Sequence, residues 1–203
     1  VFLQDTFLNK PGRKVFAWGV GVQRDAAFLY ARMDEKLGDA ELRRKAREAI
    51  VGEAESALNY ASGNAWNLTT PDKGKPMFQG FYTTPDATEL ARAHFLTKDA
   101  KFLRGVVQAT QYQSGANPIN MTFTTGLGQN PPQNPLKLDS RLTGQKTPVG
   151  ITVYGPRDSD WDDWSKWVFD YFLNKELTPA LSEWPVPETY FDIFLHPSTN
   201  EYT

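Results

Sequence analysis

The chain ends on "HPSTNEYT", which places a histidine, an asparagine and a glutamate within six positions. A carboxyl group can donate a proton near neutral pH when a partly apolar setting raises its pKa. Glu201 follows the aromatic and aliphatic stretch "YFDIFLHPST", and Asn200 can orient it with a hydrogen bond. Glu201 is therefore a candidate general acid, and the competing interpretation is an exposed residue at a frayed chain end.

The other acidic residues suggest no second catalytic carboxylate. Asp192 and Glu188 are four positions apart, and we expect them to pair with backbone or solvent. A cluster opens a predicted helix, where carboxylates interact favourably with the helix dipole; its members are Asp158, Asp160, Asp162 and Asp163. Oxygen ligands at alternate positions also suit Ca²⁺, so a structural calcium ion is possible there, and no other cofactor is predicted.

Neither the histidines nor the cysteine count predicts a metal centre. The chain has no cysteine, which excludes thiolate sites, and its two histidines are far apart. His94 is expected to be packed or half-exposed in a helix, while His196, before a proline, could reach a cleft.

Length and charge favour one soluble domain over residues 1–203, because 40% of the residues are hydrophobic and can form one core. Lys and Arg number 22 against 24 Asp and Glu, with no basic stripe, so we predict no nucleic-acid partner. No apolar run approaches the roughly 20 residues that span a bilayer, so we predict no membrane partner.

Helical spacing of apolar residues predicts two N-terminal helices, over residues 24–38 and 39–63. Gly38 is the expected end of the first, and Asp39 and Gly63 are the expected cap and stop of the second. The inward face of the first should carry Ala26, Leu29, Tyr30, Met33 and Leu37. That of the second should carry Leu42, Ala46, Ala49, Ile50, Ala57, Leu58 and Ala61.

A helical hairpin and a last helix are predicted further along. Thr84 and Pro85 should begin the hairpin, with a short turn at Asp99. Its inward residues should be Leu90, Ala91, Phe95, Phe102, Leu103, Val106, Val107 and Thr110. The last helix should start near Asp158 or Asp160.

Residues 115–157 are rich in Gly, Pro, Asn and Thr, and loops this long inside a domain are usually functional or disordered. The pieces "MTFTTG" and "GITVYG" are too apolar for a disordered linker, so an ordered loop with a short β piece is expected. Helix pairs joined by short turns at one end and long loops at the other describe an α/α barrel or bundle, with its site on the long-loop side.

The segment "SGANPINMTFTTGLGQNPPQNP" resembles the pattern G-x-N-P-x-x-x-S-[YF]-x-x-G-x-G-x-x-x-P-x-x-P of family 9 glycoside hydrolases, which are inverting endoglucanases with an (α/α)6 barrel. The matching residues are Gly115, Asn117, Pro118, Thr122, Phe123, Gly126, Gly128, Pro132 and Pro135. Thr122 stands in place of the usual serine. The helix pair before this segment and the final "NE" are similar to the family as well, so the resemblance covers roughly the second half of the chain.

The resemblance implies an all-α fold, an (α/α)6 barrel of which the chain represents about the C-terminal half. It implies hydrolysis of β-linked glucans by single displacement with inversion, Glu201 as general acid, and an extracellular or periplasmic location. Candidate substrate-binding residues, each with structural packing as the alternative, are Asn117, Asp139, Arg141, Tyr154, Trp161, Tyr190 and Asn200.

Two departures from the family pattern stand out. The usual "HHR" after P-x-x-P is missing, because Leu136 and Lys137 hold the histidine positions and only Arg141 could supply the guanidinium. The family's D-x-G-D motif, which supplies the catalytic base, is missing from this sequence. We therefore expect the base to be an Asp outside this chain, on the remaining half of the barrel from the same or another polypeptide. That remaining half should also cover an apolar seam. A noncatalytic glycan-binding protein, an exo-acting glucosaminidase-type enzyme and a helical scaffold with coincidental loop similarity remain the alternatives.

Overall fold

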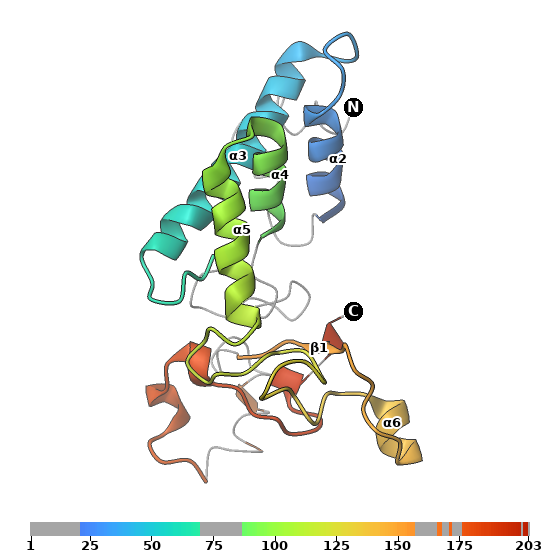
Figure 1. Cartoon of the computed structure of the whole chain (residues 1–203), viewed down its shortest axis with the longest axis vertical. Helices are drawn as coiled ribbons and strands as arrows, with labels where there is room; N and C mark the ends of the chain where they lie inside the picture. Colours follow the sequence, from blue (N-terminus) through green and yellow to red (C-terminus); the bar gives the residue numbers. More distant parts are fainter. Residues whose placement is uncertain are drawn as a thin grey trace. The chain divides into compact units, whose positions relative to one another are not determined.

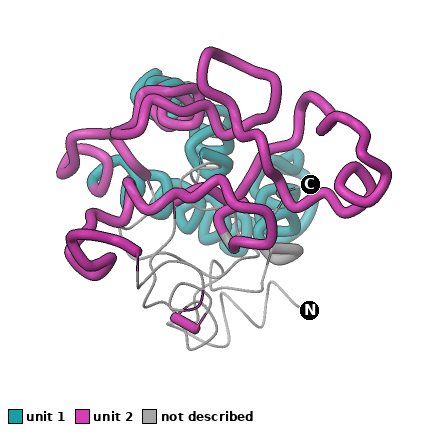
Figure 2. The backbone as a smooth tube through the Cα atoms, turned by 90° about the horizontal axis from the view of Figure 1, so that it is seen from below, with its two compact units in different colours: residues 1–59, 86–107 teal, residues 60–85, 108–203 magenta. Residues whose placement is uncertain are grey.

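The computed structural model describes residues 21–69, 87–156, 166–167, 171, 176–199 and 201–202. The chain divides into two compact units, which Figure 2 shows in different colours. We call residues 1–59 with 86–107 the helical unit, and residues 60–85 with 108–203 the loop unit. The boundaries fall inside two helices, α3 (Ala40–Ser62) and α5 (Ala100–Gln113). The organisation as a single domain over residues 1–203 stays a prediction.

The helical unit contains α2 (Gly21–Ala31), α4 (Thr88–Thr97) and parts of α3 and α5 (Figure 1). The Asp39 carboxylate accepts the Leu42 N–H at 2.8 Å, which caps α3 as predicted. Gly63 follows the last residue of this helix, also as predicted. None of the helices in the described ranges has the length and apolarity needed to cross a membrane.

Two apolar clusters hold the helical unit together. The first joins α2 to α3 through Ala27, Ala31, Ala46 and Ile50. The second joins α3, α4 and α5 through Ala54, Leu90, Ala93 and Phe102. Gly105 of α5 lets the helices approach closely, because a Cβ there would lie 2.5 Å from Leu58 Cδ2 of α3. The small residues of these helices therefore decide how tightly they pack.

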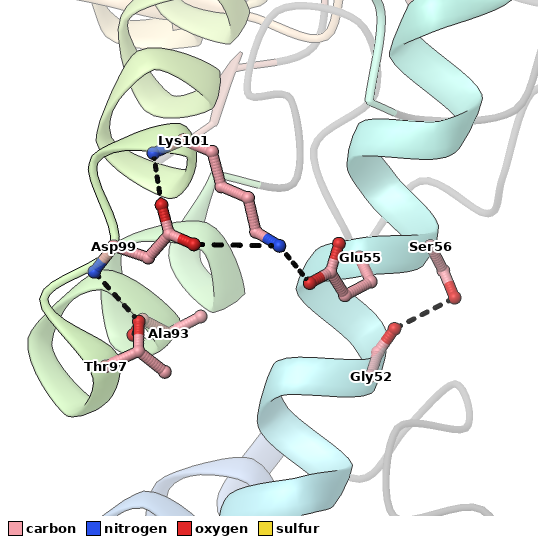
Figure 3. Close-up of polar contacts among 7 residues, drawn as sticks. All are labelled: Gly52, Glu55, Ser56, Ala93, Thr97, Asp99 and Lys101. Atoms are coloured by element: carbon pink, nitrogen blue, oxygen red, sulfur yellow. Dashed lines mark hydrogen bonds and ion pairs between the residues drawn. The ribbon is translucent and has the colours of Figure 1, made fainter.

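The predicted short turn joins α4 to α5 (Figure 3). The Asp99 N–H donates to Thr97 Oγ1 at 3.2 Å, and the Asp99 carboxylate accepts the Lys101 N–H at 2.9 Å. Lys101 Nζ donates to Glu55 Oε1 of α3 at 2.5 Å. This hydrogen bond to Glu55 is the main cause that raises the pKa of Lys101 above its ordinary value. The turn is thus held locally and also tied to a neighbouring helix.

The helix predicted for residues 24–38 ends earlier than expected, at Ala31. The Arg43 guanidinium donates to the carbonyls of Asp34 at 3.1 Å and Leu37 at 3.0 Å. Carbonyls that a longer helix would satisfy internally are thus satisfied by a side chain of α3. Because α2 stops at Ala31, Gly38, which has a positive φ of 76°, lies in the loop before α3 and does not end the helix.

The buried faces of α2 and α4 also differ from the prediction. Several residues expected to face inward are exposed: Leu29 of α2, Ala91 and Phe95 of α4, and Met33 and Leu37 in the loop after α2. The helices bury a neighbouring face that is rich in alanine, and the small side chains permit close contact there. Leu103 and Val107 of α5 are exposed as well, whereas Phe102 is buried as predicted.

The described residues of the loop unit contain little regular structure. Besides the ends of α3 and α5, the elements in its described residues are α6 (Leu138–Thr143), β1 (Thr152–Val153), the 3₁₀ turns η2 (Leu181–Glu183), η3 (Val186–Glu188) and η4 (Pro197–Thr199), and β2 (Glu201–Tyr202). Its core consists of Leu68, Tyr112, Met121, Phe123 and Val153. The short β piece was predicted and α6 was not. The helix predicted from Asp158 or Asp160 lies largely outside the described residues, as do Thr84 and Pro85.

The segment "MTFTTGLG" (residues 121–128), which belongs to the family-like motif, folds back on itself at Gly128. This residue has a φ of 69°, and a Cβ on it would lie 2.6 Å from Thr122 Cγ2. Thr122 Oγ1 donates to the Leu127 carbonyl at 2.5 Å. A serine hydroxyl could make the same hydrogen bond, which explains why threonine is accommodated at this position.

Candidate active site

Glu201 lies on β2, whose backbone pairs with that of β1 in antiparallel fashion. Val153 stands opposite Glu201 in this pair. Val153 is buried, and its N–H donates to the Phe123 carbonyl at 2.9 Å. Because Phe123 belongs to the motif "NPINMTFTTGLG", β1 pairs with β2 on one side and is hydrogen-bonded to that motif on the other. The structure thus brings together the two sequence features that suggested chemistry.

The residues just before Glu201 are held by backbone hydrogen bonds from two other segments. Leu136, directly after the segment "GQNPPQNP" that ends the family-like pattern, donates its N–H to the Thr199 carbonyl at 2.8 Å. Gly155, just after β1, donates its N–H to the Ser198 carbonyl at 2.9 Å. Ser198 and Thr199 are both buried. The path of the chain into β2 is therefore fixed before the strand begins.

His196 lies inside this segment and is fully buried. Its ring meets the Phe191 ring edge-on at 5.5 Å between centroids, and its Nδ1 accepts the Ser198 N–H at 3.2 Å. The expectation that His196 reaches an open cleft is therefore wrong, because the ring supports η4 from within. His94 is half-exposed as expected, with Nδ1 3.0 Å from the Asp99 carbonyl.

Asp192 fastens the end of the motif to the segment that leads to Glu201. Its carboxylate accepts the Gln133 N–H at 2.7 Å and the Asn134 N–H at 3.0 Å. Tyr190 donates its hydroxyl to the same carboxylate at 3.1 Å. Burial, with the Asp192 charge as a second cause, raises the pKa of Tyr190 well above its usual range. The expectation that Asp192 pairs with backbone is confirmed.

Two of the predicted substrate-binding residues make structural contacts. Asn117 is buried, and its Nδ2 donates to the carbonyls of Tyr112 and Met121, both at 2.7 Å, while its Oδ1 accepts the Met121 N–H at 3.2 Å. Tyr190 packs edge-on against Phe123 at 5.7 Å between centroids. Substrate contact by either residue stays a prediction, and their observed contacts hold the loop in shape.

Asp139 and Arg141 lie on α6, and both are exposed. Asp139 Oδ1 accepts the Ser140 N–H at 2.9 Å. The Arg141 guanidinium lies over the Phe194 ring, 4.9 Å from its centroid. Tyr154, after β1, is half-buried and packs against the core of the loop unit. Direct binding of substrate by these residues stays a prediction.

A comparison with known protein families identifies the family of this chain. A family model described as Glycosyl hydrolase family 9 matches residues 4–203. The chain belongs to this family. The match extends the likeness from the motif-bearing second half to nearly the whole chain. The curated proteins hold no match to the chain.

Solved family 9 structures confirm the predicted fold class. A metagenome-derived glycoside hydrolase family 9 endoglucanase is 24% identical, with a TM-score of 0.69 over 93% of this chain and 31% of its own. A single-mutant thermostable endoglucanase from Alicyclobacillus acidocaldarius is 21% identical, with a TM-score of 0.70 over 90% and 32%. The chain thus spans about a third of the length of these structures. Its fold is all-α and forms part of an (α/α)6 barrel.

Several residues of the expected family 9 site are not described. Trp161 and Asn200 lie outside the described residues, as does the side chain of Glu201, so their roles stay predictions. The candidate calcium ligands Asp158, Asp160, Asp162 and Asp163 lie outside them too. Within the described ranges, no three His, Asp or Glu side chains come close enough together to hold a metal ion.

The sequence analysis missed the places of Lys137 and Phe194 in the pocket beside α6. Lys137 was noted only as the replacement for a histidine, yet it lines a pocket with Arg141, and the four-residue spacing of the two cations was an available signal. Phe194 lines the same pocket from a distant part of the chain, and the sequence held no sign of that contact. The backbone clamp made by Asp192 was expected only in general terms.

Proposed function

We propose that this chain forms part of an active site that hydrolyses β-linked glucans, with Glu201 as the general acid. The observation that supports this most directly is the pairing of Glu201 with Val153, which ties it to the family 9 motif through Phe123.

In the proposed reaction, the protonated Glu201 gives its proton to the departing glycosidic oxygen. An Asp outside this chain removes a proton from the water that attacks the anomeric carbon from the opposite side. Such inverting reactions place the two carboxyl groups about 6.5–9.5 Å apart. The general-acid role requires a raised pKa, and the segment that leads to Glu201 is buried at His196 and Thr199.

The proposed substrate is a cellulose-type or mixed-linkage β-glucan. The solved relatives at a TM-score near 0.7 are endoglucanases, and one of them, AaCel9A, was solved in complex with a cellobiose-like isofagomine. An exo-acting glucosaminidase-type specificity would be recognised by release of single sugars from chitosan oligomers. A noncatalytic glycan-binding protein would be recognised by binding without turnover.

The first test of the general acid is Glu201→Gln in the full-length protein. We expect turnover of cello-oligosaccharides to fall by about 10²-fold or more with binding retained, because general acid catalysis typically contributes 10²–10⁴-fold. Glu183→Gln is the matched control, since Glu183 is exposed in the same unit. Unchanged turnover in Glu201→Gln would exclude the acid role, and retention of the β-configuration in the first product, read by NMR, would exclude inversion.

We further propose that the remaining helices of the barrel, from the same or another polypeptide, cover exposed apolar side chains of the helical unit. Three large apolar side chains are about half exposed: Leu29 of α2 at 52%, and Leu103 and Val107 of α5 at 48% and 50%. Monomeric proteins rarely leave large contiguous apolar patches uncovered. Adding the remaining helices should lower the binding of an apolar dye to the helical unit. Unchanged dye binding would contradict this proposal.

An extracellular or periplasmic location and a structural calcium ion complete the proposal. Polysaccharides are too large to enter a cell, so a family 9 glucanase needs to meet its substrate outside the cytoplasm. Activity confined to the cytoplasmic fraction would argue against this location.

The acidic residues Asp158, Asp160, Asp162 and Asp163 suit Ca²⁺ as ligands. A melting temperature that chelation of calcium leaves unchanged would exclude a calcium site there.

A further inference from the structure

A pocket of about 360 Å³ lies beside α6 in the loop unit. Its wall includes Lys137, Arg141, Gln133, Gln145, Thr147 and Phe194. The volume falls within the range of small-molecule sites, about 300–1,000 Å³. Among the described residues that line it, both charged side chains are cations, and the remaining polar ones are neutral amides and hydroxyls. Its lining therefore favours a ligand that carries a negative charge.

Arg141 is the charged group best placed to bind a ligand in this pocket. Its guanidinium lies over the Phe194 ring, 4.9 Å from the centroid, so the aromatic ring supports one face of the planar group. Within the described part of the chain, the Arg141 guanidinium has no hydrogen-bond or ion-pair partner, and only the backbone N–H of this residue donates, to the Lys137 carbonyl at 3.1 Å. The N–H groups at the edges of the guanidinium can therefore form two parallel hydrogen bonds with a ligand carboxylate.

The carboxylates near the pocket are already engaged by other groups. Asp139 Oδ1 accepts the Ser140 N–H at 2.9 Å and lies 3.7 Å from Lys137 Nζ. Asp192 accepts two backbone N–H groups of the pocket wall at 2.7 and 3.0 Å. Asp139 is thus paired with Lys137, and Asp192 is held by two backbone N–H groups, so neither carboxylate binds the Arg141 guanidinium in the described part of the chain.

We infer that this pocket binds the carboxylate of a uronic acid unit in a glycan. Arg141 holds the carboxylate, while the Gln145 amide and the Thr147 hydroxyl are available for the sugar hydroxyls. The inference rests on the proposed glucan-hydrolase function, which makes a glycan the ligand. Cellulose itself carries no carboxylate, so this pocket favours β-glucans with uronic acid units over unmodified ones.

The test compares two disaccharides that differ only at C6 of the nonreducing sugar, cellobiouronic acid and cellobiose. Isothermal titration of the full-length protein at low salt should show about tenfold tighter binding of the acid, the typical contribution of one bidentate charged contact. Arg141→Gln should abolish the preference, Arg141→Lys should retain part of it, and Lys146→Gln in the same loop should leave it intact. Circular dichroism confirms that each variant is folded.

Each outcome of this test decides something. Equal binding of the two disaccharides, or a preference that survives Arg141→Gln, overturns the inference. Displacement of cellobiouronate by equimolar acetate overturns the sugar part, since the site would then bind any carboxylate. Hydrolysis of neutral cello-oligosaccharides is measured separately, so loss of the uronate preference with hydrolysis intact refutes only this inference. Absence of hydrolysis with the preference retained refutes the proposed reaction instead.

Discussion

The interactions that stabilise the helical unit internally differ from those that stabilise the loop unit internally. In the helical unit, each helix satisfies its own backbone, and buried apolar residues such as Ile50 and Leu90 join the helices. In the loop unit, distant backbone segments satisfy one another, and a few polar side chains such as Asn117 and Asp192 bind several backbone groups at once. Stability should therefore depend on apolar volume in the first unit and on single polar groups in the second.

The largest effect is expected from Leu90→Ala in the helical unit. Leu90 is fully buried, so the truncation removes apolar contacts and leaves a cavity, which should lower the free energy of unfolding by about 3 kcal/mol. Urea denaturation followed by circular dichroism measures it. Leu37→Ala is the control, because Leu37 is 55% exposed and the substitution should cost less than about 1 kcal/mol. Equal losses at the two positions would show that packing does not dominate this unit.

A slightly smaller effect is expected from Asn117→Leu in the loop unit. The substitution keeps a similar volume but leaves the Tyr112 and Met121 carbonyls without their donor, which should cost about 2–3 kcal/mol. Hydrogen exchange at residues 117–128 should accelerate more than exchange in α3. Asn130→Leu, at an exposed position of the same loop, is the control. A wild-type unfolding curve for Asn117→Leu would refute the comparison between the units.

The smallest effect at neutral pH is expected from Tyr190→Phe, which removes the hydrogen bond to Asp192 and should cost about 1 kcal/mol. The folded-state pKa of Tyr190 is raised, so its stabilising contribution is fully present below about pH 10 and is lost as the pH rises above it. The wild-type protein should then lose up to about 1.4 kcal/mol per pH unit more than Tyr190→Phe. Parallel stability curves for the two proteins between pH 9 and 11 would contradict this.

The helical unit could be predicted largely from local sequence. The regular spacing of Leu42, Ala46 and Ile50, with the cap at Asp39, was enough to place α3. The end of α2 was missed because it depends on Arg43, a residue beyond the loop whose side chain satisfies carbonyls from several positions away. The buried faces of α2 and α4 were missed because neighbouring helices, and not the size of the side chains, decide which face is covered.

The loop unit was predictable by resemblance and scarcely by periodicity. The motif around Phe123 and the final Glu201 were found as separate features, and their connection through Val153 emerges only when the chain is folded. The contact between Arg141 and Phe194 likewise joins segments that share no local pattern. Contacts of this kind form between segments that are far apart in the chain. Local patterns in a single sequence do not reveal which distant segments meet.

The Asp192 clamp has a consequence for how this region can change over evolution or in the laboratory. Its carboxylate binds the backbone N–H groups of residues 133 and 134, and every residue except proline offers such a group whatever its side chain. The segment stays anchored while its side chains are exchanged. Libraries that vary positions 133, 137, 141 and 145 around a constant Asp192 should therefore yield folded proteins with new ligand preferences.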